Sequence, residues 1–263
     1  MSTSHASDPV TLTRDGAVAV LSFNRPAALN ALDIASAQAF AAACRSIASD
    51  TGVRAVVMRG EGKAFGAGGD VAQMAAGGAD VARALIESMH EGVRLLARID
   101  APVVASLHGV VAGGSLSLAA GCDLAIAAEG TRFNLAYANI GASCDVSGSW
   151  SLPRLVGLRN ALQIALLSET FDAAEALRLG LVNRVVPAEQ LEATVTALAQ
   201  RLASGPTHAY GHLKRLMRQS FEHDFSAQLD AERDAFLDCT RTADFTEGIT
   251  AFAAKRKPQF SGR

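Results

Sequence analysis

Paired cysteines at metal-binding or redox spacing are missing from this sequence of 263 residues. No CxxC motif occurs, and the N-terminus has no basic stretch followed by an apolar run. These absences predict reduced thiols in a cytoplasmic protein without a signal peptide. The four scattered cysteines are Cys44, Cys122, Cys144 and Cys239.

An excess of charge of either sign is also absent. The formal net charge is −2, from 24 basic and 26 acidic residues. Neither a nucleic acid nor an anionic membrane surface is therefore expected as the main partner. Aromatic residues make up only 5% of the chain, which gives little material for a pocket walled by aryl side chains.

Uninterrupted hydrophobic runs long enough for a membrane-spanning helix, about 20 residues, are missing too. The nearest candidate is residues 101–122, which contain no Asp, Glu, Lys or Arg but are interrupted by Gly109, Gly113 and Gly114. A buried strand, a glycine turn and a buried helix fit this segment better. The chain is expected to be soluble, with no membrane partner.

Apolar residues are abundant instead, at 49% of the chain against 19% charged, so a sizeable core is expected. Strand-like and helix-like patterns alternate to about residue 190, which predicts an α/β fold with parallel strand pairing. Beyond a joint at Gly205 and Pro206 the pattern is helical. We therefore expect a loose tail over 1–15, a core over 16–200 and a helical oligomerisation region over 201–263.

Individual elements follow from periodicity and from glycine or proline stops. The expected strands cover 16–26, 53–60, 102–109 and 122–129, with a short strand after Gly180. The expected helices cover 34–49, 79–99, 113–121 and the segment from 170 to Gly180.

Two glycine-rich turns are the first candidates for chemistry. KAFGAGGD at 63–70 follows an expected strand, and HGVVAGGSLSL at 108–118 joins a strand to a helix. Glycine lets a backbone approach a ligand closely, and two backbone N–H groups directed at one oxygen form an oxyanion hole. Two ordinary tight turns would have the same sequence. Neither turn matches the nucleotide-binding patterns GxGxxG or GxxxxGK[ST].

Histidines and one aspartate are the other candidates. His208 and His212 are four residues apart, as metal ligands on a helix would be, but the glutamate of HExxH is missing and no metal site is expected. His90 falls at the edge of an apolar helix stripe, where a packing role fits equally well. Asp145, in GASCDVSGSW, has no basic neighbour and is either a helix N-cap or an acid–base group.

Four motifs carry a family resemblance. They are FNRPAALNAL at 23–32, KAFGAGGD at 63–70, PVVASLHGVVAGGSLSLAAGCDLAIAA at 102–128 and FAAKRKPQF at 252–260. In this order they resemble the enoyl-CoA hydratase/isomerase family, also called the crotonase superfamily, over about residues 18–260. The resemblance implies a spiral of ββα units with a helical C-terminal trimerisation domain. It also implies a homotrimer or hexamer and an acyl-CoA substrate.

The resemblance implies roles for single residues as well. The N–H groups of Gly69 and Gly114 would hold the thioester oxygen as an enolate forms. Coenzyme A would enter as part of the substrate, with no permanently bound cofactor and no metal. Two loop segments would contact its adenine and phosphates, and the C-terminal region would reach the CoA of a neighbouring subunit. The implied CoA contacts are Arg25, Ala28, Leu29, Ala67, Asp70, Val71, Phe252 and Lys255.

Hydratases of this family use two glutamates, and this chain has Ser117 and Tyr137 at the matching positions. Neither side chain is a good base near pH 7, so two-glutamate hydration is not expected. Asp145 resembles an aspartate of two other branches, those of 1,2-epoxyphenylacetyl-CoA isomerase and 4-chlorobenzoyl-CoA dehalogenase. His90 falls where the dehalogenase branch has a histidine.

The chemistry distinguishes these branches. Moving a double bond needs one base that takes a proton from one carbon and returns it to another. Dehalogenation needs Asp145 as nucleophile, His90 as base and an aromatic pocket. The sequence therefore favours an enoyl-CoA isomerase with Asp145 as acid and base, and with His90 and Tyr137 as further candidate residues. A dehalogenase-like hydrolase, a hydratase with a non-standard site and a non-catalytic CoA-ester binding protein stay open.

Overall fold

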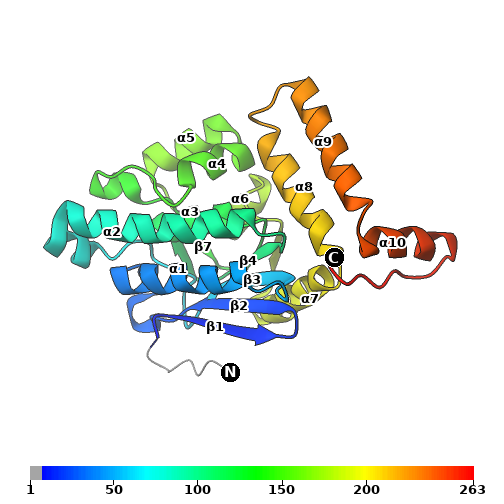
Figure 1. Cartoon of the computed structure of the whole chain (residues 1–263). Helices are drawn as coiled ribbons and strands as arrows, with labels where there is room; N and C mark the ends of the chain where they lie inside the picture. Colours follow the sequence, from blue (N-terminus) through cyan, green and yellow to red (C-terminus); the bar gives the residue numbers. More distant parts are fainter. Residues whose placement is uncertain (1–7) are drawn as a thin grey trace.

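A six-stranded sheet with helices on both faces organises residues 8–263, the part of the chain that this computed structural model describes (Figure 1). The first two strands pair antiparallel, and every later neighbour in the sheet is parallel. The predicted α/β class with parallel pairing is therefore confirmed. In sheet order the strands are β1 (Val10–Asp15), β2 (Val18–Phe23), β3 (Ala55–Gly60), β4 (Val103–Leu107), β6 (Leu124–Ala128) and β9 (Arg184–Val186).

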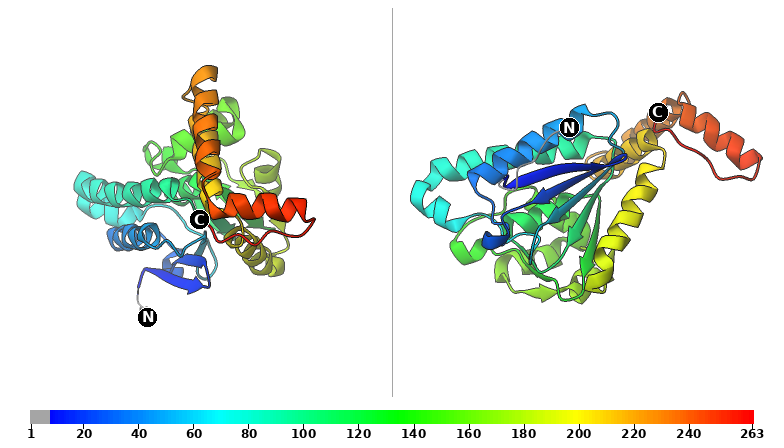
Figure 2. Two further views of the ribbon diagram at one scale, coloured as in Figure 1. Left: turned by 45° about the vertical axis from the view of Figure 1, so that its right-hand side comes forward. Right: turned by 90° about the horizontal axis from the view of Figure 1, so that it is seen from below.

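Alternation of side chains along the strands divides the core between two layers. In β3, Val56 and Met58 belong to the larger cluster, together with apolar side chains of α1 (Ile34–Ser49), α2 (Val71–Arg98) and α3 (Gly113–Gly121). Val57 faces the other way and packs with α7 (Leu191–Ala203). The sheet thus lies between the α1–α3 layer and α7 (Figure 2).

A second, three-stranded sheet lies beside the first. It consists of β5 (Val110–Ala112), β7 (Arg132–Asn134) and β8 (Phe171–Asp172). The segment 101–122 is the strand, turn and buried helix that the sequence predicts, since it contains β4, β5 and α3. Within residues 8–263 no helix combines the length and apolar character that crossing a membrane requires.

Two predicted boundaries are wrong. The tail expected over 1–15 is shorter, because residues 10–15 form β1, which completes the open edge of β2 through six antiparallel register pairs and buries Val10. Residues 1–7 of that tail lie outside the described part. The helix expected to begin at residue 79 begins instead at Val71, where Asp70 caps it by accepting from the N–H of Gln73 at 3.1 Å. Gly78, with φ +58°, interrupts the helical geometry near the expected start.

Helices dominate the rest of the chain, as predicted. The last three extend from the core, and α9 and α10 project furthest from it (Figures 1 and 2). The later α-helices are α4 (Gly148–Val156), α5 (Leu158–Leu167), α6 (Ala173–Arg178), α8 (Thr207–Gln219), α9 (Phe225–Cys239) and α10 (Ala243–Ala253). Single 3-10 turns are η1 (Pro26–Ala28), η2 (Tyr137–Ile140) and η3 (Ala188–Gln190).

Candidate active site

The loops that carry the sequence motifs follow the carboxyl ends of β2, β3 and β4, where open parallel sheets place their ligands. Backbone hydrogen bonds join the first two loops. The N–H of Ala67 donates to Leu29 O at 2.9 Å, that of Leu32 to Gly68 O at 2.7 Å, and that of Asp70 to Leu32 O at 2.8 Å. The segments 24–33 and 61–70 therefore form one continuous wall.

The two glycine bends touch each other. A Cβ added to Gly68, which has φ +93°, would lie 3.1 Å from Ala112 O and 3.3 Å from the Cα of Gly113. Ser115 Oγ joins the same contact by accepting from the N–H of Gly68 at 3.3 Å. Glycine suits this approach and the positive φ, so Gly68 is favoured by the packing between the bends.

The sequence does not reveal the role of Ser115. This residue of α3 holds the first glycine bend by accepting from the N–H of Gly68. Gly66 leaves room for it, since a Cβ there would lie 2.3 Å from Ser115 Oγ. The only signal in the sequence is a small hydroxyl residue directly after the second glycine pair.

Gly69 and Gly114 each come directly after one of the two touching glycines, Gly68 and Gly113. Within residues 8–263 neither N–H donates to a protein acceptor. For Gly114 this follows from its place in the first turn of α3, because N–H groups there have no intrahelical partner and lie at the positive end of the helix. Both amides are thus left available for an external oxygen.

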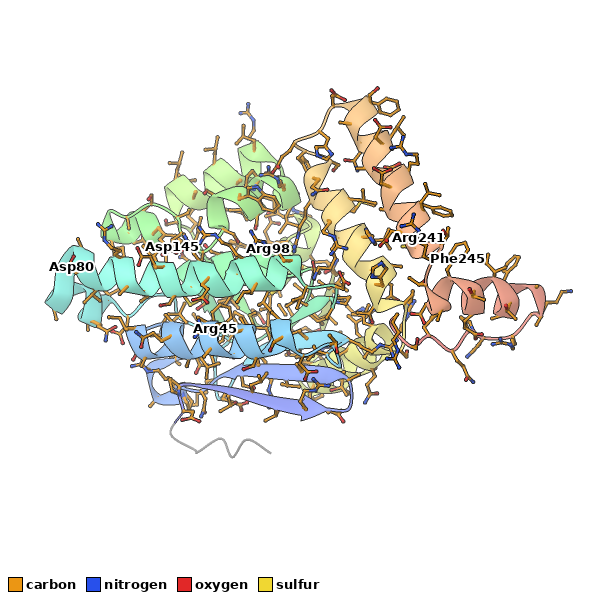
Figure 3. The ribbon with its side chains drawn as sticks, in the orientation of Figure 1. Arg45, Asp80, Arg98, Asp145, Arg241 and Phe245 are labelled. Atoms are coloured by element: carbon orange, nitrogen blue, oxygen red, sulfur yellow. The ribbon has the colours of Figure 1, made fainter. Side chains whose placement is uncertain are left out.

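A chain of three hydroxyl and carboxyl groups leads away from Gly114. Ser117 Oγ of α3 lies 3.1 Å from the hydroxyl of Tyr137 in η2, and that hydroxyl donates a short hydrogen bond to Asp145 Oδ1. A Cβ on Gly114 would lie 3.6 Å from both Asp145 Oδ1 and the Tyr137 hydroxyl. The structure therefore brings the predicted residues Gly114, Tyr137 and Asp145 together. Figure 3 shows Asp145 between α2 and the α4–α5 layer.

Tyr137 serves as a permanent donor in this chain. Burial, and then the negative charge of Asp145, raise the pKa of Tyr137 well above its usual value near 10. The phenol therefore stays protonated and donates to Asp145 rather than accepting a proton. Of the two carboxylate oxygens, Oδ2 remains free of this contact.

Asp145 is not the N-cap of α4. That helix has Ser147 at its N-cap, and no side chain caps it. In the described part of the chain the carboxylate receives the Tyr137 hydroxyl and no backbone N–H. The loop instead holds Val146 at φ +50° and Ser147 at φ +69°, conformations that strain non-glycine residues and that are common at functional sites.

His90 supports the same loop from α2. Its Nε2 accepts from the N–H of Val146 at 3.1 Å. Because a backbone N–H can only donate, this nitrogen carries no proton and its lone pair is already used. His90 thus positions the residue next to Asp145, and its Nε2 is not available as a base.

The predicted CoA contacts on the core have structural partners of their own. Arg25 pairs with Asp33 at 3.2 Å and with Asp70 at 3.3 Å, and donates to Ala31 O at 2.6 Å. These two carboxylates balance the charge of Arg25. Through them Arg25 links the segment 24–33 to the segment 61–70. Asp70 also caps α2. Among the other predicted CoA contacts on the core, Leu29 and Val71 are exposed, while Ala28 and Ala67 are half-buried.

Phe252 and Lys255 stand apart from this site within their own chain. Both are exposed at the end of α10, and Phe252 is 87% exposed. Figure 3 shows Phe245, at the start of the same helix, on the opposite side of the view from Asp145. A contact between α10 and an active site would therefore involve another copy of the chain.

The thiols show no chemistry of their own in this region. All four cysteines are free, as expected for reduced thiols. Burial raises the pKa of Cys122 to about 12, and burial followed by the charge of Asp145 raises that of Cys144 beside the site. Both thiols thus stay protonated near pH 7 and are poor nucleophiles.

Comparison with known proteins identifies the family of the chain. The family model described as enoyl-CoA hydratase/isomerase matches residues 13–263. The 1,2-epoxyphenylacetyl-CoA isomerase of Escherichia coli (strain K12) is 34% identical over 250 residues, covering 94% of this chain and 95% of that protein. The short-chain-enoyl-CoA hydratase of Clostridium acetobutylicum is 33% identical over 249 residues, with 94% and 95% covered. The crystal structure of enoyl-CoA hydratase from Bacillus anthracis matches with a TM-score of 0.92 at 28% identity, covering 97% of this chain and 100% of that one.

Proposed function

The chain belongs to the enoyl-CoA hydratase/isomerase family and is an enzyme of the crotonase superfamily, and on that premise we propose that it is an enoyl-CoA isomerase in which Asp145 moves the proton. The resemblance and the fold expected from the motifs are confirmed. CoA thioesters are the substrates of this family. Isomerisation in preference to hydration is our proposal.

The surroundings of Gly114 carry this proposal. The three side chains nearest to the position of its missing Cβ are those of Asp145, Leu32 and Tyr137. They supply one carboxylate, one aliphatic wall and one protonated phenol. A single carboxylate beside an oxyanion donor suits proton transfer between two carbons, whereas the family's hydration chemistry uses two glutamates, whose places Ser117 and Tyr137 take.

The proposed reaction converts a 3-enoyl thioester to a 2-enoyl thioester. Asp145 Oδ2 removes a proton from C2, and the electron pair moves onto the thioester oxygen as a dienolate forms. The N–H groups of Gly69 and Gly114 hold that oxygen, each contributing about 3–4 kcal/mol to the transition state. Asp145 then returns the proton to C4, the double bond moves to C2–C3, and no water is consumed.

The test compares wild-type protein with Asp145→Asn. We expect isomerisation of a 3-enoyl-CoA to fall by about 10²–10⁴-fold, the usual contribution of an acid–base group, while the Kd for a saturated acyl-CoA stays the same. Asp172→Asn is the control, since Asp172 caps α6 by accepting from the N–H of Glu175 at 2.9 Å. Unchanged turnover in Asp145→Asn would refute the proposal.

The same substrate panel decides between the alternatives. Faster hydration of a 2-enoyl-CoA than isomerisation of a 3-enoyl-CoA by the wild type would identify a hydratase. Chloride release from 4-chlorobenzoyl-CoA would identify a dehalogenase-like hydrolase, although the contact between His90 Nε2 and Val146 N–H counts against the base that this reaction needs. Binding without turnover of any ester would identify a non-catalytic protein.

A further inference from the structure

Three possible metal-ligand side chains, His208, His212 and Cys239, lie close together where α8 and α9 run side by side, and the carboxylate of Asp238 bonds to both histidines. His208 and His212 lie one turn apart on α8, and both direct Nε2 at the same oxygen, Asp238 Oδ2, at 2.7 Å and 2.9 Å. Cys239 follows Asp238 at the end of α9, and its sulfur and one nitrogen of each histidine lie within 4.8 Å of one another.

We propose that His208, His212, Asp238 and Cys239 bind one divalent transition-metal ion, zinc above all. Two imidazole nitrogens, one carboxylate oxygen and one thiolate sulfur make a four-coordinate set of the kind that zinc takes. Donors of this mixed softness disfavour magnesium and calcium, which prefer oxygen alone. Tetrahedral zinc ligands lie about 3.3–3.7 Å apart. The two imidazoles and the thiol, which lie within 4.8 Å of one another, would have to draw closer by side-chain rotation. Asp238 would have to exchange its hydrogen bonds to the two rings for a bond to the metal.

The surroundings of the histidines are those of a prepared site. Asp100, which follows α2, places Oδ2 at 3.6 Å from His208 Nδ1, within ion-pair range but beyond a hydrogen bond, so a small movement would let it hold the ring with Nε2 towards Asp238. Carboxylates commonly hold zinc-bound histidines in this way. Gly211 makes the approach possible, because a Cβ there would lie 1.8 Å from Asp100 Oδ1.

This proposal departs from the sequence-based expectation of no metal. The sequence around His208 contains a glycine and lacks the glutamate of HExxH, which argued against a zinc protease motif. The remaining donors come from a different helix, with Asp238 placed 30 residues after His208. The site is separate from Asp145: Arg241, two residues beyond Cys239, lies on the opposite side of Figure 3. Its role would be to fasten the projecting helix α9 to α8.

Cobalt provides the direct test. Tag-free full-length protein is titrated with CoCl₂ and watched for the visible d–d bands and the near-ultraviolet thiolate-to-cobalt band. We expect one cobalt per chain, displaced by ZnCl₂ and not by MgCl₂ or CaCl₂. Cys239→Ser should abolish the thiolate band, and Asp100→Asn should weaken binding about 10–100-fold. His212→Ala should weaken it more than Asp100→Asn does.

His223→Ala is the matched control, because His223 follows α8, is exposed and bonds to Gln228 at 3.2 Å instead. It should bind cobalt as the wild type does. A second measurement needs no variant: zinc should slow alkylation of Cys239 in the wild type while leaving that of Cys144 unchanged, as read by mass spectrometry. Absence of a thiolate band, equal affinities of wild type and His212→Ala, or an alkylation rate of Cys239 that zinc does not alter would each overturn the site.

Discussion

Hydrogen bonds from distant parts of the chain hold the proposed proton carrier in place. Asp145 receives the hydroxyl of Tyr137, and the next residue, Val146, donates to His90 on α2. Ser117 on α3 contacts the Tyr137 hydroxyl from the other side. Asp145 therefore presents Oδ2 in a direction fixed by three elements, which is what a proton transfer between two carbons requires.

Tyr137→Phe tests this arrangement. The variant loses a hydrogen bond to a charged group, worth about 1.5–3 kcal/mol, so kcat for isomerisation should fall about 10–100-fold with little change in KM. Because burial and Asp145 raise the pKa of Tyr137, the wild-type rate should show no decline caused by its ionisation near pH 10.

The pH–rate profiles of Tyr137→Phe and of the control Tyr210→Phe complete that experiment. Tyr210 lies on α8 with its ring next to Gly205, and loss of its hydroxyl should leave kcat unchanged. A decline near pH 10 that is present in the wild type and absent from Tyr137→Phe would show that the phenol ionises in the working range, contrary to this account.

Sequence patterns single out the residues of the candidate site but not the contacts between them. Gly69 and Gly114 stand out because glycine pairs follow strands, and Asp145 stands out as an unpaired carboxylate. The bond from His90 to Val146 is not predictable, since it joins residues 56 apart and uses a backbone N–H. Arg25 likewise suggests a phosphate contact in sequence, whereas its partners Asp33 and Asp70 become neighbours only in the folded chain.

At the scale of elements, a buried ion cluster attaches α8 to the core. Lys214 Nζ and Arg218 each lie 2.9 Å from a different oxygen of Asp123, which precedes β6. Lys214 also donates to the carbonyls of Ile99 and Ala101 at 3.1 and 2.8 Å. Burial lowers the pKa of Lys214, and the charge of Asp123 opposes that shift.

Asp123→Ala should therefore destabilise the protein strongly. The Lys214 and Asp123 side chains are only 8% and 13% exposed, so the variant leaves a buried cation without its partner. Removing one member of a buried pair costs about 3–5 kcal/mol, measurable by chemical denaturation. The exposed pair of Asp230 and Arg233 on α9 gives the control, because Asp230→Ala should leave the free energy of unfolding unchanged. Equal effects of the two variants would show that α8 is not anchored by this cluster.

The sequence predicts the buried elements well and the boundary elements poorly. The helix at 113–121 and the strands at β4 and β6 follow from apolar runs bounded by glycine. β1 is missed because half of its residues are exposed, so its sequence lacks a clear apolar alternation. The strand forms through its pairing with β2. The first turns of α2 are missed because Gly77 and Gly78 resemble a loop, although Asp70 starts a helix before them.

At the scale of the whole molecule, a single chain leaves many large apolar side chains exposed on its later helices. Such surfaces are typical of interfaces between proteins. The trimer or hexamer stays a prediction, which light scattering of the native protein will check. The most exposed of them are Leu158, Leu166, Met217, Phe221, Phe225, Phe236 and Phe252.

An active site shared between subunits gives the last prediction. Because Phe252 lies at the end of the projecting helix α10, it should contact the CoA of a neighbouring chain rather than its own. Phe252→Ala should raise KM for the acyl-CoA, and Asp145→Asn should lower turnover by about 10²–10⁴-fold. In oligomers co-assembled from both variants, some sites combine the intact Asp145 of one chain with the intact Phe252 of another.

These mixed oligomers should therefore show a fraction of turnover with the wild-type KM. The control is a mixture of the two variants that were assembled separately and do not exchange subunits. Such a mixture should lack this low-KM turnover, because no site in it combines an intact Asp145 with an intact Phe252 from another chain. If co-assembled oligomers show only the raised KM of Phe252→Ala, then Phe252 serves the active site of its own chain. If Phe252→Ala does not raise KM at all, then Phe252 serves no active site. Recovery of the low KM would instead establish that assembly completes the CoA site, which explains why so apolar a helix end stays exposed in one chain.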